Sequence, residues 1–314
     1  MLKKLAIGIF LFTSSAVAGE LIVFHAGSLS VPFEKMEKKF KKLHPEIKII
    51  REASGSVQAI RKVVDLKRKC DVVASADYSL IPKMMFPKFA NQVKVFAANE
   101  LVLCYTEKSK FSQKVNSKNW FKVLSSKGVK WGFSNPNLDP CGYRTLMTIA
   151  LAQNYYGKPI FNQIFNKKIN LKLKESGKEL IIEVPERLRI SSNKIFVRPK
   201  AVALLGLLES GAIDYAFEYK SVALQHGLKF VELPKEINLS ELKYKNFYSR
   251  VKVKLGSGKI IEGKPIAYGI AVVKGAPHPK EAQLWEEFVT SKDGAKILEE
   301  CWQTPIYPAK VIRK

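Results

Sequence analysis

The chain has 314 residues, of which 46% are hydrophobic and 26% are charged. This composition excludes a disordered chain and leaves room for two medium-sized α/β domains, each with its own core. Lysine and arginine number 53 against 28 aspartates and glutamates, so the net charge is +25. The basic residues are spread along the chain without a nucleic-acid-binding signature. We therefore interpret them as a solvated surface that also attracts anions, and predict no nucleic acid partner.

Residues 1–18 have the order of a secretory signal peptide. Lys3 and Lys4 precede a short apolar run, and Ala16-Val17-Ala18 forms a cleavage pattern of small residues. The run is too short to cross a bilayer as a stable helix, and no Cys follows the cleavage pattern to carry a lipid anchor. We predict an exported protein, in the periplasm or on the outer face of the cell membrane. A buried N-terminal helix is the alternative.

The first part of the remaining chain alternates strands and helices. The apolar runs 21–24, 47–50 and 71–74 predict buried strands. Residues 31–43 predict a helix with Pro32 in its first turn and Ser30 as its cap, and Val57 begins a second amphipathic helix. The face of the first helix would be formed by Phe33, Met36, Phe40 and Leu43. This alternation predicts a mostly parallel sheet covered by helices on both faces.

A second unit begins near Glu100. Its predicted strands cover 101–105, 130–133 and 213–217, and its predicted helices follow Gly142 and cover 202–210, where Gly211 is the expected stop. The tail adds a predicted strand at 266–273 and a predicted helix at 280–298, which the pattern alone does not place in either unit.

Two loops repeat one arrangement that suits an anion. Residues 25–30 and 51–56 each follow a strand, open a helix and contain small residues and serines. Backbone N–H groups, a helix N-terminus and hydroxyl donors together bind an anion without a formal cation. The alternative is that the serines only cap helices: Ser28, Ser30, Ser54 and Ser56.

Two further segments carry a carboxylate at a strand end. Residues 133–143 contain Asp139 in a loop held by proline and glycine, and residues 214–219 contain Glu218. Asp139 as a plain turn residue and Glu218 as a solvated side chain are the alternatives.

Taken in order, these four segments resemble the molybdate/tungstate-binding proteins of ABC importers. The Ala-Gly-Ser and Ala-Ser-Gly-Ser loops, Asn135-Pro136 through Pro140-Cys141-Gly142, and Glu209-Ser210-Gly211 leading into 214–219 resemble most the archaeal-type branch. The resemblance implies a two-lobed type II periplasmic-binding-protein fold, with mixed, mostly parallel sheets flanked by helices and the ligand in the interlobe cleft. It implies lobe I at 19–97 plus 235–314 and lobe II at 98–234.

The resemblance also implies the site. Ser28, Ser56 and Tyr219 match hydroxyl donors, Asp139 and Glu218 match carboxylates that bind the metal atom itself, and the backbone positions are Gly27, Pro140, Cys141 and Ala201. The implied function is that of an extracytoplasmic solute-binding protein that captures tungstate or molybdate and delivers it to a membrane permease with its ATPase. We expect a monomer that is peripheral to the membrane and needs no cofactor.

Other oxyanions, ferric iron and an enzyme are the alternatives. A sulfate or phosphate site would use similar donors, and ferric-iron binders present paired tyrosines such as Tyr155-Tyr156. An enzyme is disfavoured because the chain has no HExxH, no G-x-S-x-G and no P-loop. His25 beside the first serine loop is interpreted as a core or rim residue. Four cysteines without a C-x-x-C pair indicate no zinc site, and the sequence does not pair them in disulfides: Cys70, Cys104, Cys141 and Cys301.

Overall fold

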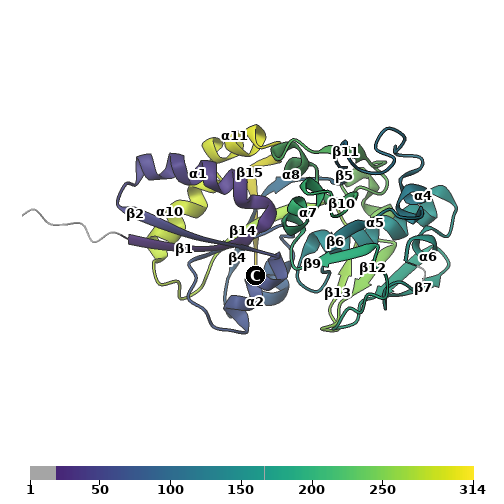
Figure 1. Ribbon diagram of the computed structural model, residues 1–314. Coiled ribbons are helices and arrows are strands. Elements are labelled where there is room, and N and C mark those ends of the chain that lie inside the picture. Colours follow the sequence, from purple (N-terminus) through teal and green to yellow (C-terminus); the bar gives the residue numbers. More distant parts are fainter. Residues whose placement is uncertain (1–18, 166) are drawn as a thin grey trace, which may run out of the picture.

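The computed structural model of the protein describes residues 19–165 and 167–314, so the predicted signal peptide lies outside the described residues. Two α/β lobes lie side by side, each built around its own sheet (Figure 1). The two ends of the chain share lobe I, and the middle of the chain forms the sheet of lobe II. The predicted fold class is confirmed. Within the described ranges, no helix has both the length and the apolar character to cross a membrane.

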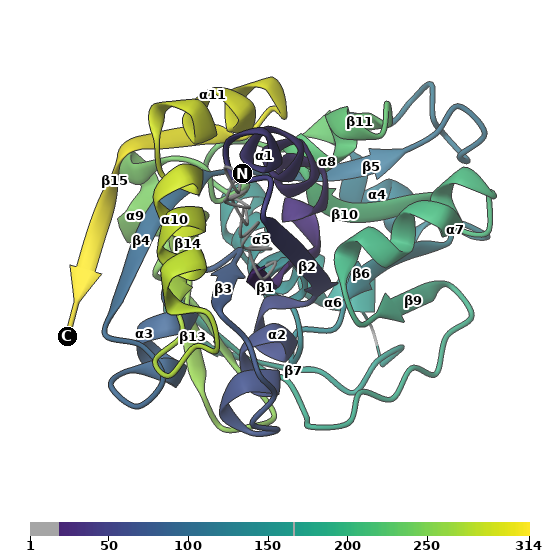
Figure 2. The same ribbon diagram turned by 90° about the vertical axis from the view of Figure 1, so that its left-hand side faces the viewer.

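Lobe I contains a six-stranded sheet in the order β15-β4-β14-β3-β1-β2. The first three strands along the chain are parallel, and the others are antiparallel to their neighbours: β1 (Gly19–Ala26), β2 (Ile47–Ser54), β3 (Val72–Ser75), β4 (Gln92–Ala98), β14 (Ala267–Val272) and β15 (Thr304–Arg313). On one side pack α1 (Ser30–Leu43), α10 (Pro279–Val289) and α11 (Lys292–Glu300), and on the other α2 (Ser56–Val64) and α3 (Leu80–Met85) (Figure 2). The loops that follow β1, β2 and β3 therefore gather at one edge.

Lobe II contains a five-stranded sheet in the order β11-β5-β10-β6-β9. Its strands are β5 (Leu101–Tyr105), β6 (Trp131–Ser134), β9 (Ile195–Arg198), β10 (Tyr215–Tyr219) and β11 (Lys229–Glu232). Helix α5 (Pro140–Tyr156) is buried along its first thirteen residues and packs on β5, β6 and β10. Smaller helices complete the lobe: α4 (Trp120–Ser125), α6 (Ile160–Phe165), α7 (Leu205–Glu209) and α8 (Lys220–Gln225).

A third, four-stranded sheet joins segments that are distant in the sequence. It has the order β13-β12-β8-β7, with β7 (Lys172–Ser176), β8 (Glu179–Glu183), β12 (Val251–Lys254) and β13 (Ile260–Glu262). The chain reaches β12 through η3 (Leu242–Tyr244) and α9 (Lys245–Tyr248).

This pairing differs from the predicted division, which places everything after residue 235 in lobe I. The buried residues of β12 lie opposite those of β8, with Val251 beside Leu180 and Val253 beside Ile182. Helix α5 packs against β12. Burial of these apolar side chains therefore holds β12 and β13 against lobe II.

The tail also differs from the sequence prediction. The predicted helix at 280–298 is two helices, because Ser291 caps α11: its Oγ accepts a hydrogen bond from the Gly294 N–H at 3.2 Å. The predicted helix at 202–210 begins as the 3-10 turn η2 (Ala201–Leu204) and continues as α7. Gly211 ends it with φ +72°, as predicted. Strand β15 was not predicted.

Two smaller predictions concern α1 and the cysteines. Phe33, Met36 and Phe40 are buried as expected, but Leu43 is 58% exposed, and Ser30 is the first helical residue rather than the cap. All four cysteines fall within the described residues, and each is buried and free of disulfides.

Candidate anion-binding site

The two serine loops meet at the edge of lobe I where parallel strands end. Ser28 lies in the 3-10 turn η1 (Gly27–Leu29) after β1, and Ser56 is the first residue of α2 after β2. Both are buried, with exposed fractions of 5% and 0%. The carboxyl ends of strands in an open α/β sheet are the usual place for a ligand. The alternation of strand and helix in lobe I thus positions both hydroxyls at the same edge of its sheet.

Hydrogen bonds set the direction of both serine hydroxyls. Ser56 Oγ accepts from the Ala76 N–H at 2.9 Å. Ser28 Oγ accepts from the Tyr268 hydroxyl at 3.1 Å, and that hydroxyl accepts from Asn99 Nδ2 at 3.1 Å. Each serine oxygen is already used as an acceptor, so its hydrogen remains to donate to a ligand.

These serines do not cap helices. The N-cap residues of η1, α1 and α2 are Ala26, Leu29 and Gly55, and none makes a side-chain cap bond. Ser54 is buried too, but its Oγ accepts from Lys62 Nζ at 3.1 Å. The capping interpretation is therefore wrong for Ser28 and Ser56, and Ser54 has a partner of its own.

Lobe II contributes a tyrosine and the start of α5. Tyr219 ends β10 and is buried, and its hydroxyl oxygen accepts from Arg144 Nη1 at 2.7 Å. Pro140 and Cys141 begin the first turn of α5, where Pro140 has no N–H and the Cys141 N–H has no intrahelical acceptor. The Cys141 thiol is directed to the Phe217 carbonyl oxygen at 3.7 Å, which leaves only its backbone facing the helix end.

Both predicted carboxylates are buried. Asp139 Oδ2 accepts from the Ala201 N–H at 2.9 Å, and Glu218 Oε1 accepts from the Tyr219 N–H at 2.8 Å. Glu218 Oε2 is buried without a hydrogen-bond partner. Burial raises the pKa of Asp139 to about 6. Burial, with the nearby charge of Asp139, raises the pKa of Glu218 to about 8. The solvated alternative for Glu218 is therefore wrong, and Asp139 is a buried residue that bonds the backbone of another segment.

One predicted donor has another partner in this structure. The Ala201 N–H, at the start of η2, is bonded to Asp139 rather than left free. An anion at this place would have to share or replace that bond.

The lobes touch directly through two glycines. A Cβ on Gly55 would lie 2.3 Å from the Leu138 carbonyl oxygen, and one on Gly27 would lie 2.8 Å from a Val202 methyl. The Gln58 N–H also donates across the lobes to the Leu138 carbonyl oxygen at 3.2 Å. The structure is thus a closed arrangement, and only glycine permits so close an approach at these two positions.

Sequence analysis missed a group of charged residues behind the site. Arg144, Asp77 and Lys264 are brought together, with Lys264 Nζ 3.1 Å and Arg144 Nη2 3.9 Å from the Asp77 carboxylate. The available signal was Arg144 itself, since it is the one charged residue in the sequence of α5. A charge within a buried helix needs partners, and these lie on elements far away in the sequence.

The ferric-iron alternative loses its structural basis. Tyr155 and Tyr156 are at the far end of α5 from Cys141. The rise of an α-helix places these tyrosines about 20 Å from Cys141. Tyr155 is 43% exposed, and the Tyr156 hydroxyl donates to the Ser117 carbonyl. Across residues 19–165 and 167–314, no group of three or more His, Cys, Asp or Glu could hold a metal ion.

His25, next to the first serine loop, is a core residue. It is 1% exposed, and its Nδ1 lies 2.8 Å from the Ala26 carbonyl oxygen. Burial lowers its pKa to about 4, so the ring is neutral at pH 7.

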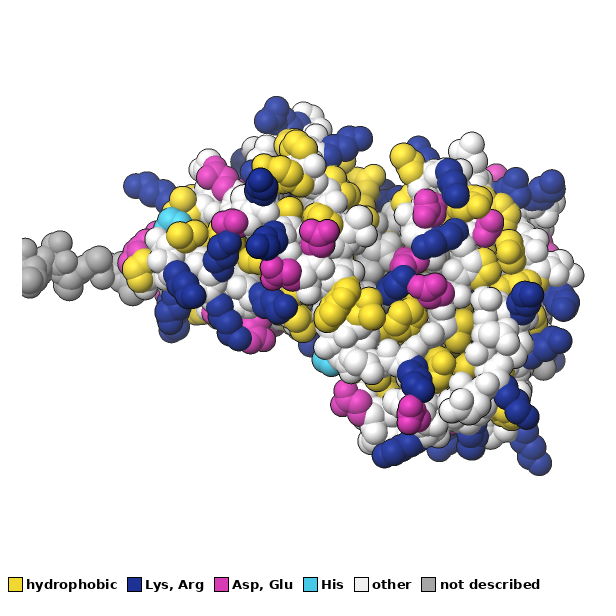
Figure 3. Space-filling view, turned by 90° about the horizontal axis from the view of Figure 1, so that it is seen from above, with side chains coloured by type: hydrophobic (Ala, Val, Ile, Leu, Met, Phe, Trp, Pro, Cys, Tyr) yellow, Lys and Arg dark blue, Asp and Glu magenta, His cyan; other side chains and the backbone are white. Residues whose placement is uncertain are grey.

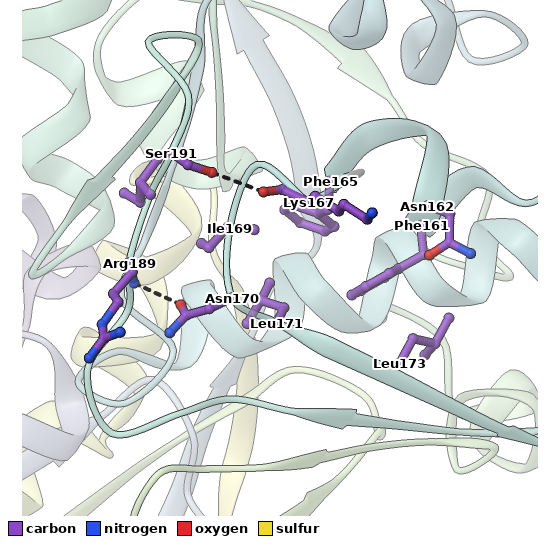
Figure 4. Close-up of a pocket in the computed structure, with 11 residues that line it drawn as sticks. Phe161, Asn162, Phe165, Lys167, Ile169, Asn170, Leu171, Leu173, Arg189 and Ser191 are labelled. Carbon is purple, nitrogen blue, oxygen red and sulfur yellow. Dashed lines mark hydrogen bonds between the residues drawn. The ribbon is translucent and has the colours of Figure 1, made fainter.

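A separate pocket lies elsewhere in lobe II (Figure 4). It is lined by α6 and by the segments around Asn170 and Arg189, which are joined by a hydrogen bond from the Arg189 N–H to Asn170 Oδ1. None of the predicted site residues lines this pocket. It is not the site that the four loops form.

The fold and the site define a class of protein. Residues 21–301 match the family model of bacterial extracellular solute-binding proteins, so the chain belongs to that family. Its members are solute-binding proteins rather than enzymes.

Relatives within this family are named for two oxyanions. The chain is 45% identical to the molybdate/tungstate-binding protein WtpA of Thermococcus kodakarensis, over 92% of this chain and 82% of the relative. It is also 45% identical to WtpA of Pyrococcus abyssi, over 92% of this chain and 85% of the relative. The periplasmic molybdate-binding protein of Azotobacter vinelandii shares the fold, with a TM-score of 0.60, 16% identity, and coverage of 90% and 98% of the two chains. The predicted resemblance is confirmed.

Proposed function

We propose that this protein is the exported solute-binding component of an ABC transporter, that it captures tungstate or molybdate between its lobes, and that it delivers the oxyanion to a permease with its ATPase. The observation that carries this proposal is a set of buried hydroxyls from both lobes, with Ser56 and Tyr219 connected through Ala76 and Arg144. Ser28 and Ser56 come from lobe I, and Tyr219 and the first turn of α5 come from lobe II. Gly27 and Ala201 add backbone N–H groups, of which that of Ala201 would have to leave Asp139, and Pro140 has no N–H and serves only to fix the start of α5.

Asp139 and Glu218 select tungstate and molybdate over other oxyanions. Two buried carboxylates repel a dianion in a site from which water is excluded. Hexavalent tungsten and molybdenum are hard centres that accept further oxygen ligands, whereas sulfur and phosphorus in their oxyanions do not readily do so. We propose that each carboxylate places one oxygen on the metal, so that repulsion acts only against sulfate and phosphate. The unpartnered Oε2 of Glu218 supports this role.

Two other roles for the carboxylates are alternatives. They could turn to solvent, but both are buried. They could remain protonated and donate hydrogen bonds to the oxyanion, which their raised pKa values favour. Coordination of the metal by the carboxylates and hydrogen bonding by the neutral acids predict opposite changes of tungstate affinity with pH.

A ligand that contacts both lobes favours the closed state by its differential contacts. The direct contacts at Gly27 and Gly55 limit how far the lobes close, which gives the donors a fixed spacing. A cage of that spacing prefers the larger tungstate and molybdate to sulfate, whose oxygens lie closer to the central atom.

The location and partners follow from the same proposal. On the face shown in Figure 3, basic side chains are scattered over both lobes with acidic ones among them, which suits a solvated surface rather than a nucleic-acid-binding stripe there. We propose a monomer that works at the outer face of the membrane without a cofactor. In the native host, mass spectrometry is expected to find a chain that starts at or near Gly19. An intact Met1 on a cytosolic protein would contradict export.

Calorimetry with four oxyanions tests the proposed ligand. We expect tungstate and molybdate to bind tightly, and sulfate and phosphate to bind much more weakly or not at all. Scattering with and without tungstate reports on lobe closure in the same samples. Sulfate binding as tight as tungstate binding would contradict the proposal and favour a sulfate or phosphate binder.

A further inference from the structure

Arg144 is a buried cation that the proposed site does not explain. It lies in the second turn of α5 and is 2% exposed. A buried guanidinium is strongly unfavourable unless it is paired and hydrogen-bonded. Its contacts therefore indicate why the fold retains a charge at this position.

The guanidinium connects the two lobes. Arg144 Nη1 donates to the Ala76 carbonyl oxygen at 2.7 Å in lobe I and to the Tyr219 hydroxyl oxygen at 2.7 Å in lobe II. Its Nη2 is 3.9 Å from Asp77 Oδ2 and has no hydrogen-bond acceptor. A single side chain thus holds one backbone group and one proposed ligand donor.

Those two bonds influence the orientation of two hydroxyls of the proposed site, those of Tyr219 and Ser56. Tyr219 accepts from Arg144 through its oxygen, so its hydrogen is left for the oxyanion. Burial raises the pKa of Tyr219 well above its ordinary value, although Arg144 opposes this, so the hydrogen is retained. Arg144 also bonds the Ala76 carbonyl oxygen, and the N–H of the same residue, Ala76, donates to Ser56 Oγ. The same guanidinium therefore supports a donor on each lobe.

Asp77 holds Arg144 from lobe I. Its Oδ2 accepts from the Tyr143 hydroxyl of lobe II at 2.7 Å, and its Oδ1 accepts from Ser79 and is paired with Lys264 at 3.1 Å. Burial opposes ionisation of this carboxyl, but Lys264 and Arg144 hold its pKa well below the usual range. Arg144 and Lys264 together with the single carboxylate of Asp77 carry a net charge of +1. This charge lies behind a site that is proposed to bind a dianion.

We propose that Arg144 is a positioning residue for oxyanion capture: held by Asp77, it ties the closed lobes together and keeps Tyr219 and Ser56 as hydrogen-bond donors. This inference rests on the proposed function, since it assigns a residue to the same site. Arg144 acts through Tyr219 and the Ala76 peptide rather than by touching the oxyanion.

Double-mutant cycles test this role by calorimetry with tungstate. Arg144→Met is expected to weaken tungstate binding by about 10- to 100-fold, the range for loss of a hydrogen bond to a charged group. Arg144→Lys keeps the charge but not the two-pronged geometry, so its loss should be smaller but measurable. If Arg144 orients Tyr219, then Arg144→Met and Tyr219→Phe together should cost clearly less than the product of the two separate losses.

Ser28 provides the matched control. Its hydroxyl is oriented by Tyr268 and Asn99 and makes no bond to the Arg144 network. Arg144→Met combined with Ser28→Ala should therefore multiply the separate losses. A general loosening of the fold would couple equally to both partners, so equal coupling to Ser28 and Tyr219 would overturn the inference.

Scattering of the tungstate-bound protein tests the interlobe tie. Arg144→Met and Tyr143→Phe, which removes only the bond to Asp77, should both give a larger radius of gyration than the wild type. Unchanged dimensions in both variants, or tungstate binding by Arg144→Met and Arg144→Lys as tight as in the wild type, would overturn the inference and leave the proposed function intact. A wild type that does not bind tungstate would overturn the proposed function itself.

Discussion

The two lobes bring different chemistry to the same site. The proposed ligand groups of lobe I are neutral hydroxyls, oriented by a peptide N–H and by Tyr268, and the neighbouring His25 is uncharged. Lobe II brings the two carboxylates, and Arg144 behind Tyr219. Neutral donors suit any tetrahedral oxyanion, whereas charged groups distinguish between oxyanions. Lobe I is therefore expected to provide affinity for the whole class, and lobe II the choice within it.

The largest expected effect follows from removing both carboxylates. Asp139→Ala combined with Glu218→Ala should reduce tungstate affinity by more than about 100-fold, because two bonds to the metal are lost. Sulfate binding should be unchanged or stronger, because the repulsion is removed as well. Calorimetry with both anions measures the difference.

X-ray absorption on the wild-type tungstate complex is the companion measurement. We expect six oxygen neighbours around tungsten, two of them at longer distance. Four equal short bonds, with the double variant binding tungstate normally, would show that lobe II does not select by direct coordination.

The contact between the lobes is tested by Gly55→Ala. The new Cβ would lie 2.3 Å from the Leu138 carbonyl oxygen, so one of the lobes must shift, closure should be incomplete and tungstate affinity should fall more than tenfold. Scattering should then show less compaction with tungstate than in the wild type. Gly206→Ala in α7 is the matched control, since a Cβ there meets no atom within 4 Å. Normal compaction of the Gly55 variant would contradict the closed geometry.

Ser56→Ala tests the contribution of a neutral hydroxyl donor of lobe I. Its loss should weaken binding by roughly 1–3 kcal/mol, the usual effect of leaving a buried polar partner unpaired. Because the hydroxyl makes no distinction between central atoms, tungstate and sulfate should lose similar fractions of their affinity. Ser54→Ala is the control, since that buried serine is bonded to Lys62 instead. A loss confined to tungstate would mean that lobe I also selects.

The smallest effect is a dependence on pH. The pKa of Glu218 is raised from 4.5 to about 8, so the folded ligand-free protein binds more protons than the unfolded chain between these values. Its stability should therefore fall as pH rises from about 5 to 8, and Glu218→Gln should reduce that fall. Denaturant unfolding at several pH values measures it.

The direction in which tungstate affinity changes with pH distinguishes two roles of Glu218. If Glu218 coordinates the metal as a carboxylate, binding releases a proton, and affinity should rise with pH by up to about tenfold per unit below pH 8. If Glu218 instead donates a hydrogen bond as a neutral acid, affinity should fall as pH rises. The second result would replace direct coordination by hydrogen bonding.

Some of this site follows from local sequence. Small residues after a strand and before a helix place Ser28 and Ser56 at a strand edge in any parallel α/β arrangement. The serine loops, the 133–143 loop and the end of β10 were each found in this way, and the family resemblance related them to one another. The buried state of Asp139 and Glu218 could not be found locally, because a carboxylate at a strand end is solvated unless another lobe covers it.

The sequence by itself determined the alternation of strands and helices, and with it which loops end at the site, because period and turn residues are local properties. Tertiary structure alone decided three things. It placed β12 and β13 against lobe II, where Val251 and Val253 find apolar partners in β8. It broke the 280–298 segment at Ser291. It gave Arg144 partners in Ala76, Asp77 and Tyr219, which lie 68, 67 and 75 residues away along the chain. Contacts over such separations depend on how the lobes pack, and no local pattern encodes them.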